Sequence, residues 1–189
     1  MVAASFALAQ RSDGGNMHYT QRSRKVLDDV KLVRQILEHE KGRVEWRLQW
    51  ITAVVLIRAV GHVLAKVDGA TNPLVREVSN KLHKKWMKPE EDRTIFKDFI
   101  EEERNSILKE YEFGMSEGPV PIALTIKNPS TGELAEQQAF ISENIYRPMW
   151  SGPYEGEDGR TLLDEAITWW EEQLSIVDRE VASRTPAKG

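Results

Sequence analysis

One arginine occupies a position where a predicted helix should bury apolar side chains. At ~100° per residue, Phe96, Ile100 and Ile107 share one helical face with Tyr111, and Arg104 falls on that same face. A guanidinium does not lose its charge in a protein, so it is tolerated there only with a partner or beside a cleft. The sequence therefore predicts either an ion pair or an open cationic site at Arg104.

A second polar stripe is predicted on the helix expected at residues 44–67. Arg47, Arg58 and His62 lie within roughly 60° of one another on this otherwise apolar helix. In one interpretation the stripe is a buried ion-pair network, with Arg58 paired to a glutamate of the helix that carries Arg104, and His62 satisfied by a hydrogen bond. In the other, facing helices form a concave polar site. His62, the only histidine predicted deep in the bundle, would then carry a proton near neutral pH.

The residues from 104 to 111, Arg-Asn-Ser-Ile-Leu-Lys-Glu-Tyr, resemble the active-site signature of the HEPN superfamily of all-helical nucleotide- and RNA-associated domains. In that signature an arginine, often followed by an asparagine, stands a few residues before a histidine. One branch, found in toxin–antitoxin modules, adds a tyrosine two positions after the histidine. Arg104, Asn105 and Tyr111 match in kind and spacing, whereas Lys109 stands at the place of the histidine.

The resemblance implies an all-helical protein that binds RNA or a nucleotide, or acts as a metal-independent endoribonuclease, in a toxin–antitoxin or defence setting. Arg104 would contact a phosphate, with Asn105 and Tyr111 in support. Lys109 holds the motif position of the histidine, and His62 from the neighbouring helix would take over the handling of a proton. Sites of this family are typically completed across a dimer interface, so a homodimer is expected.

The run at residues 81–88 is basic and contains one aromatic residue, Trp86. Such a segment could contact phosphates through its lysines while the indole stacks on a base. It is more typical of a solvated helix end whose lysines offset the helix dipole. Trp86, together with Arg58 and Arg47 of the polar stripe, completes the set of candidate substrate-binding residues.

A non-enzymatic role is the competing hypothesis. Lys109 in place of the histidine and a net charge of −4 favour a protein-interaction or structural homodimer of the same fold. In that case the polar stripe is structural, and the segment 118–160, with its hairpin and aromatic loop, binds a protein partner. The Arg-Asn pair at 104–105 and the inward polar stripe favour the RNA or nucleotide hypothesis instead.

The elements that must position these residues form an antiparallel bundle of about five helices, so the expected fold class is mainly α. Apolar residues recur at helical spacing in five segments, which Gly, Pro and Asn residues separate. Asn72 and Pro73 open the third segment, and Thr161 with Asp164 forms a capping-box-like pair at the start of the last. The five helices are expected at 20–41, 44–67, 73–86, 89–113 and 161–183.

A small β-hairpin is expected before the last helix. Ile122, Leu124 and Ile126 alternate with smaller or polar residues. Residues 128–132 give a strong turn signal, and the return strand is expected at 137–145. A lone hairpin is marginal in water, so it should pack on the helices or on another copy of itself. The expected domains are a flexible leader at 1–19, one helical domain at 20–184 with the insertion at 118–160, and a tail at 185–189.

Composition limits the chemistry further. The 189 residues are 40% hydrophobic and 30% charged, as in an ordinary globular protein, and the lack of cysteine excludes disulfides, thiol nucleophiles and thiolate zinc sites. No metal-spaced histidine pair, Gly-rich phosphate loop or Rossmann fingerprint occurs, so no metal or cofactor is expected.

Of the carboxylates at 101–103, one should face inward, because consecutive residues splay around a helix. The longest strongly apolar run, 51–57, is too short to span a membrane, so a cytoplasmic protein without membrane contact is expected.

Overall fold

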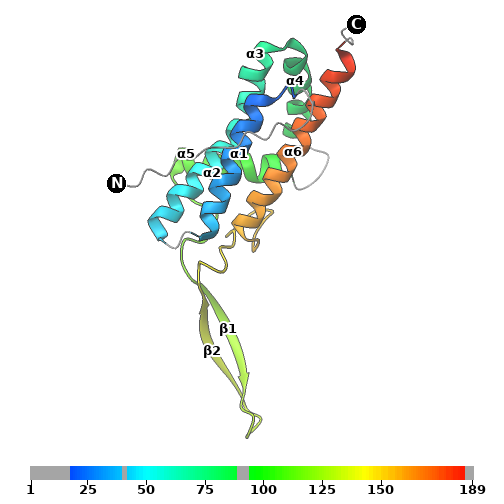
Figure 1. The fold of residues 1–189 in the computed structure, drawn as a ribbon. Helices are drawn as coiled ribbons and strands as arrows, with labels where there is room; N and C mark the ends of the chain where they lie inside the picture. Colours follow the sequence, from blue (N-terminus) through cyan, green and yellow to red (C-terminus); the bar gives the residue numbers. More distant parts are fainter. Residues whose placement is uncertain (1–17, 40–41, 89–93, 186–189) are drawn as a thin grey trace, which may run out of the picture.

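The computed structural model describes residues 18–39, 42–88 and 94–185, which form a mainly helical bundle with a two-stranded hairpin before the last helix (Figure 1). The expected fold class is therefore confirmed. Most of the expected leader and tail, at 1–17 and 186–189, lies outside the described residues. The elements are α1 (Gln21–His39), α2 (Arg43–Val63), the π-helical η1 (Leu64–Asp68), α3 (Gly69–Thr71), α4 (Pro73–Met87), the π-helical η2 (Ile95–Glu101), α5 (Glu102–Glu110), β1 (Val120–Lys127), β2 (Leu134–Ile141) and α6 (Gly159–Arg184).

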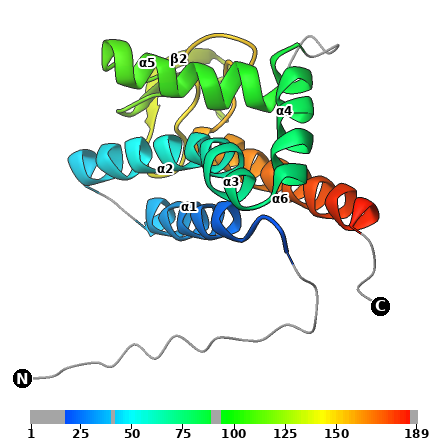
Figure 2. The same cartoon turned by 90° about the horizontal axis from the view of Figure 1, so that it is seen from above.

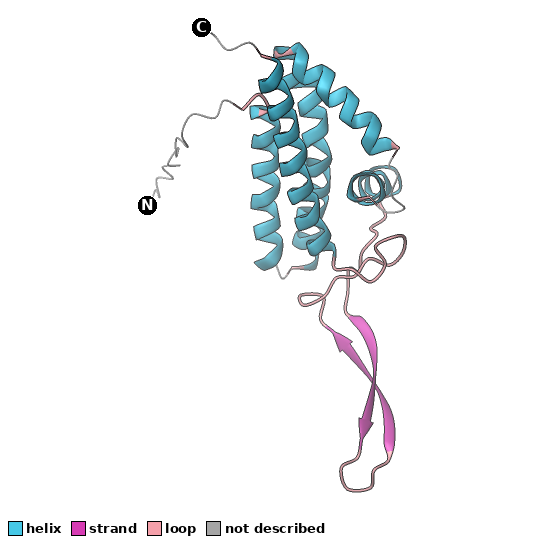
Figure 3. Ribbon diagram, turned by 90° about the vertical axis from the view of Figure 1, so that its right-hand side faces the viewer, coloured by secondary structure: helices cyan, strands magenta, loops and turns pink. Residues whose placement is uncertain are grey.

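Three long helices, α1, α2 and α6, lie side by side and form the body of the bundle (Figure 2). Helix α4 leaves one end of this body at an angle and leads toward η2 and α5, which run across the bundle and pack on α2 (Figure 3). Large aromatic and aliphatic side chains fill the space between these helices. The largest fully buried apolar residues include Trp46, Trp50, Trp170, Phe96, Phe99 and Leu27.

Residues 43–71 form one helical segment, in which α2 passes into η1 and then α3. By length and composition alone this segment could cross a membrane. The sequence argument considered only the uninterrupted apolar run 51–57 and therefore missed this longer segment. A core helix of a bundle has the same properties, and α2 packs against α1, α5 and α6. The cytoplasmic location stays a prediction. The residues that α2 buries are Trp46, Trp50, Ala53, Val54, Ile57 and Val60.

The predicted helix starts are correct in one case and wrong in another. The side chain of Asn72 caps α4 by accepting a hydrogen bond from Leu74 N at 3.0 Å, and Pro73 occupies the first turn, as predicted. Helix α6 begins earlier than predicted, because Asp158 rather than Thr161 is its cap and accepts a hydrogen bond from Arg160 N at 2.9 Å.

The helix expected at 89–113 is not regular. Its first residues, 89–93, lie outside the described part of the chain, and the described part begins as the π-helical η2 before α5 continues it. Phe96, Ile100 and Ile107 are buried on one face as predicted. Tyr111 is not, because it ends α5 in the left-handed conformation with φ 55° and leaves its side chain 60% exposed. A wider π-turn and a helix that stops at residue 110 both break the ~100° phase on which the prediction relied.

The hairpin projects from the end of the bundle as an arm (Figures 1 and 3). The turn at 128–132 is confirmed, since Asn128 N donates to the Glu133 carbonyl at 2.8 Å. The return strand β2 starts three residues earlier than predicted and ends at Ile141. Among the described elements, β1 and β2 contact only each other, so the bundle does not cover the arm.

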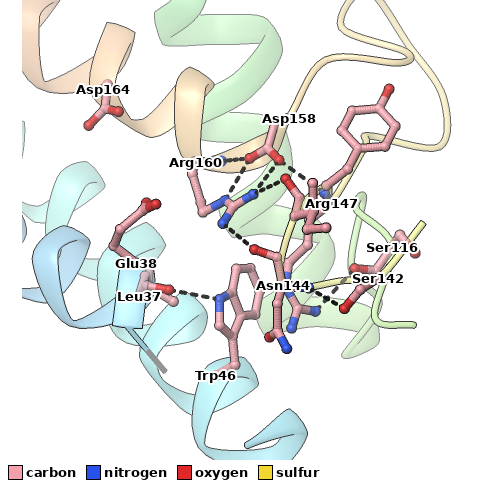
Figure 4. Close-up of polar contacts among 12 residues, drawn as sticks. Leu37, Glu38, Trp46, Ser116, Ser142, Asn144, Arg147, Asp158, Arg160 and Asp164 are labelled. Atoms are coloured by element: carbon pink, nitrogen blue, oxygen red, sulfur yellow. Dashed lines mark hydrogen bonds and ion pairs between the residues drawn. The ribbon is translucent and has the colours of Figure 1, made fainter. Parts of the chain in front are cut away.

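The stem that joins the arm to the bundle is anchored by two arginines (Figure 4). Arg160 is paired with Asp158 at 2.8 Å and donates to the carbonyls of Asn144 and Ile145. Arg147 is 1% exposed, and its guanidinium lies 3.8 Å from the centroid of the Trp46 ring. Its Nε and Nη2 atoms have no hydrogen-bond partner among the described residues, and burial lowers its pKa. The Arg147 guanidinium therefore stacks on Trp46, and only some of its N–H groups have a hydrogen-bond acceptor.

Two substitutions of Arg147 distinguish the contribution of its packing from the contribution of its charge to stability. Arg147→Met keeps the length of the side chain on Trp46 and removes a poorly satisfied buried charge, so we expect the free energy of unfolding to change by less than about 1 kcal/mol, or to increase. Arg147→Ala leaves a cavity beside Trp46 and should cost about 2–4 kcal/mol. Urea unfolding of both variants measures the difference. Equal destabilisation by Met and Ala would show instead that the charge itself stabilises the stem.

Candidate functional site

Arg104 lies half-buried near the start of α5, and no acid of the described residues neutralises its charge. Its Nη1 atom donates a hydrogen bond to the side-chain oxygen of Asn105 at 2.7 Å. Among the described residues, no carboxylate lies within ion-pair distance of this guanidinium. Of the two alternatives predicted for Arg104, the structure therefore favours the open cationic position over the ion pair. The neutral amide of Asn105 orients the guanidinium and leaves its charge available.

Arg58 of α2 has the opposite character. It pairs with Glu101 at 2.8 Å, and the two side chains are only 13% and 19% exposed. Its guanidinium also lies 5.4 Å from the centroid of the Phe96 ring. The ion-pair interpretation of the stripe is therefore correct for Arg58, which is held in place and largely neutralised.

His62 lies one helical turn beyond Arg58, and the prediction that it is deep in the bundle is wrong. Its side chain is exposed, because the inward face of α2 at this level is filled by Ile57 and Val60. Partial burial of the ring and the positive charges of Arg58 and Arg104 lower the pKa of His62. At neutral pH the imidazole is therefore uncharged, and it lies within electrostatic range of both arginines.

The other predicted site residues lie apart from this cluster. Arg47 pairs with Glu117 at 3.6 Å, 11 residues before Arg58 and so about 16 Å away along α2. The exposed side chain of Tyr111 contacts Phe113. The exposed Lys109 lines a cleft that Arg104 does not line. The structure places His62 within electrostatic range of Arg58 and Arg104, and Asn105 contacts Arg104. Arg47 and Tyr111 lie apart, whereas Lys109 lines the same cleft as Asn105.

Trp86 belongs to the aromatic core rather than to an open surface. Its ring lies about edge-on to Trp169 and Trp170, with centroids 5.2 and 5.3 Å away, and its Nε1 atom donates to Gln173 at 3.0 Å. These contacts disfavour stacking of the Trp86 indole on a base, which stays a prediction. The lysines at 81, 84, 85 and 88 are exposed, as expected for a solvated helix end.

Glu103 is the inward member of the three carboxylates at 101–103, and its role was not predicted. It is 4% exposed and accepts hydrogen bonds from Trp50 Nε1 at 2.9 Å and from Gly114 N at 3.1 Å. Burial raises its pKa, although both hydrogen bonds act in the other direction. A Cβ atom at position 114 would overlap the Glu103 carboxylate, so the close approach of this backbone requires glycine.

A cleft of about 590 Å³ opens above Glu103, between α5 and the loop that precedes α6. Met149 and Tyr154 of that loop are buried, whereas Trp150 is 54% exposed. Two of these three apolar side chains therefore pack on the bundle. Within the described part of the chain, no cluster of three or more His, Asp or Glu side chains could hold a metal ion.

The raised pKa of Glu103 predicts a pH-dependent stability that Glu103→Gln should remove. A group whose pKa is raised on folding stabilises fully below its unfolded pKa of about 4.5, and this contribution is lost as the pH rises through the folded pKa. We therefore expect the melting temperature of Glu103→Gln to rise relative to that of the unmodified protein between pH 4.5 and 8. Glu110→Gln, at an exposed position, should show no such trend. A constant difference in melting temperature across this pH range would contradict the assignment.

Comparisons with known proteins do not identify the chain. No family model, curated protein or solved structure matches it. The resemblance of residues 104–111 to the HEPN signature therefore stays a prediction.

Proposed function

We propose that this protein is a HEPN-like helical protein that binds the phosphate groups of RNA or a nucleotide at Arg104. The observation that carries the proposal is the unneutralised guanidinium of Arg104, oriented by Asn105 at 2.7 Å. A planar guanidinium with a fixed orientation binds the oxygens of a phosphate through paired hydrogen bonds. Arg104 donates to the side-chain amide of Asn105, whereas ion pairs with carboxylates are formed by Arg24, Arg34, Arg47, Arg58, Arg160 and Arg184.

The charges around Arg104 support an anionic ligand. Arg58 forms an ion pair with Glu101, so the two residues add little net charge. The pair joins α2 to η2 beside the site. His62 has a lowered pKa and is neutral at pH 7, so its imidazole can both donate and accept a hydrogen bond. The net positive charge at this junction of α2 and α5 is then that of Arg104.

The same arrangement is suited to metal-independent RNA cleavage. A neutral His62 can take the proton of a ribose 2′-hydroxyl as that oxygen attacks the adjacent phosphorus. The 5′ oxygen leaves and takes a proton from water, and the product is a 2′,3′-cyclic phosphate. Arg104 stabilises the charge that develops on the phosphate oxygens. In this proposal His62 supplies the proton chemistry that the motif assigns to the residue at Lys109.

Binding of a labelled single-stranded RNA tests the proposal. We expect Arg104→Gln to weaken binding about 10-fold to 100-fold, because it removes a charged hydrogen bond to phosphate, and to lower the salt dependence by about one phosphate contact. Fluorescence anisotropy at several salt concentrations measures both effects. If cleavage occurs in EDTA, His62→Gln should abolish it and leave binding nearly intact.

Arg184→Gln is the matched control. It removes the same charge from an exposed helix end, where Arg184 pairs with Glu77 and Glu180. We expect it to bind RNA like the unmodified protein. Equal binding by the unmodified protein and Arg104→Gln, or equal losses in both variants, would refute a phosphate site at Arg104.

A second candidate function, assembly into a homodimer, is favoured by the arm. In the register of β1 and β2, one face of the arm is apolar at every position except Gln137, and none of its residues is charged. Leu124 and Ile126 on this face are 41% and 47% exposed. The face consists of Val120, Ile122, Leu124, Ile126, Ala135, Gln137, Ala139 and Ile141.

The occupant that fits this face best is the same face of a second copy. An isolated two-stranded hairpin is marginally stable in water, so a permanent cover is needed. Two uncharged faces do not repel each other, and two hairpins packed face to face form a small sandwich. Extension of the sheet at the edge of β1 is disfavoured, because Pro121 has no N–H and lies on the outward-bonding side of the strand.

An aspartate introduced on one or the other face of the arm tests whether the dimer forms through the apolar face. We expect a dimer for the unmodified protein and a monomer for Leu124→Asp, because the carboxylate would be buried in the sandwich. Thr125→Asp, the neighbouring position on the opposite face, should remain a dimer. Sedimentation velocity at micromolar concentration measures the mass. A monomeric unmodified protein, or equal disruption by both substitutions, would exclude pairing through this face.

A further inference from the structure

We propose that the cleft above Glu103 binds an organic cation, a primary ammonium or guanidinium group, at a site separate from Arg104. The cleft has a volume of about 590 Å³, within the range typical of small-molecule sites. It lies between α5 and the loop before α6, and Glu103 is part of its lining. Arg104 does not line this cleft, although its partner Asn105 does, and the inference does not depend on phosphate binding at Arg104.

The Glu103 carboxyl group has donors on the protein side and lacks a cation. Trp50 Nε1 and Gly114 N both donate to Oε1, and Gly114 N also donates to Oε2. These contacts suit an ionised carboxylate, whereas burial without a positive partner raises the pKa of the group. No Lys, Arg or His of the described residues forms an ion pair with it. A ligand cation would supply the missing charge and favour the ionised form of Glu103.

Aromatic side chains form part of the wall of the cleft. The rings of Phe99 and Tyr154, both lining residues, lie edge to face with centroids 6.3 Å apart, and Phe99 also packs on Trp50 at 6.2 Å. Aromatic faces attract a desolvated cation, and their apolar surface accommodates the carbon chain that carries it. A buried carboxyl group beside aromatic rings favours an amine or guanidine over a neutral or anionic ligand.

The charged residues at the rim of the cleft also favour a cation over an anion. Three carboxylates face two lysines, so together with Glu103 the lining is net negative when all groups are ionised. An anion would have to approach Glu103 at a short distance, which burial makes costly. The rim residues are Lys97, Asp98, Glu102, Lys109 and Glu110.

The indole of Trp50 provides a direct reporter, because its N–H donates to Glu103. We expect n-butylguanidinium to shift the Trp50 indole resonance in ¹H–¹⁵N NMR spectra in a saturable way, and neutral n-butylurea to leave it unchanged. Glu103→Gln, an isostere of the protonated acid, should weaken binding about 10-fold to 100-fold. Glu136→Gln, which loses the same charge at an exposed position of the arm outside the cleft, should bind as well as the unmodified protein.

The pH dependence of binding by the unmodified protein is a second measurement that needs no variant. Because the cation favours ionised Glu103, binding should strengthen from pH 5 to pH 8 and release a proton. A Gly-Arg-Gly amide peptide distinguishes the source of the cation. Binding of the peptide as tight as that of n-butylguanidinium indicates a side chain of a partner protein, and binding of n-butylguanidinium alone indicates a free small molecule.

Three results would overturn the inference. The first is an unshifted Trp50 resonance with n-butylguanidinium, and the second is an equal shift with n-butylurea. The third is an affinity of the unmodified protein that stays the same at pH 5 and pH 8. This last result stands even if Glu103→Gln fails to fold.

Discussion

The hydrogen bond from Trp50 to Glu103 fixes the rotation of α5 on α2, and both candidate sites depend on that rotation. Glu103 is buried against the bundle, with Gly114 closing over its carboxyl group. The next residue, Arg104, is turned by ~100° and therefore cannot share this environment. One helix thus presents a buried carboxyl group with a raised pKa to a cleft and an open guanidinium in another direction. A different rotation would bury the arginine and expose the acid.

The stem of the arm shows how the fold accommodates charge at its periphery. Arg160 is fully engaged with Asp158 and two backbone carbonyls, whereas Arg147 relies on the face of Trp46. Trp46 also stacks on Trp50 with centroids 5.5 Å apart, so the stem and α5 contact the same pair of indoles. Packing at the base of the arm and the position of Glu103 are therefore physically connected through α2.

Much of the fold could be predicted from local patterns. Helical spacing of apolar residues gave the helices, and Asn72-Pro73 gave one start correctly. The alternation before residue 127 and the turn at 128–132 gave the hairpin, although not the length of its return strand. These features depend on short-range sterics and capping, which the residues themselves encode.

The site was harder to predict, because it depends on the relative rotation of helices. The pairing of Arg58 with a glutamate of the facing helix was anticipated, but the partner is Glu101. The depth of His62 was predicted wrongly, because Ile57 and Val60 fill the inward face of α2 at that level. The face of Tyr111 was predicted wrongly, because η2 and the early end of α5 do not keep the ideal helical phase. The role of Glu103 required knowledge that Trp50 and Gly114, far apart in the chain, meet at its carboxyl group.

The central claim is that Arg104 is an available cation while Arg58 is not. The most direct measurement follows the Nε–Hε resonances of the arginines by ¹H–¹⁵N NMR while adenosine monophosphate is added. The account predicts a saturable shift of the Arg104 resonance and almost no change for Arg58, which Glu101 holds. An Arg104 resonance that does not move, or one that shifts no more than those of surface arginines, would contradict it.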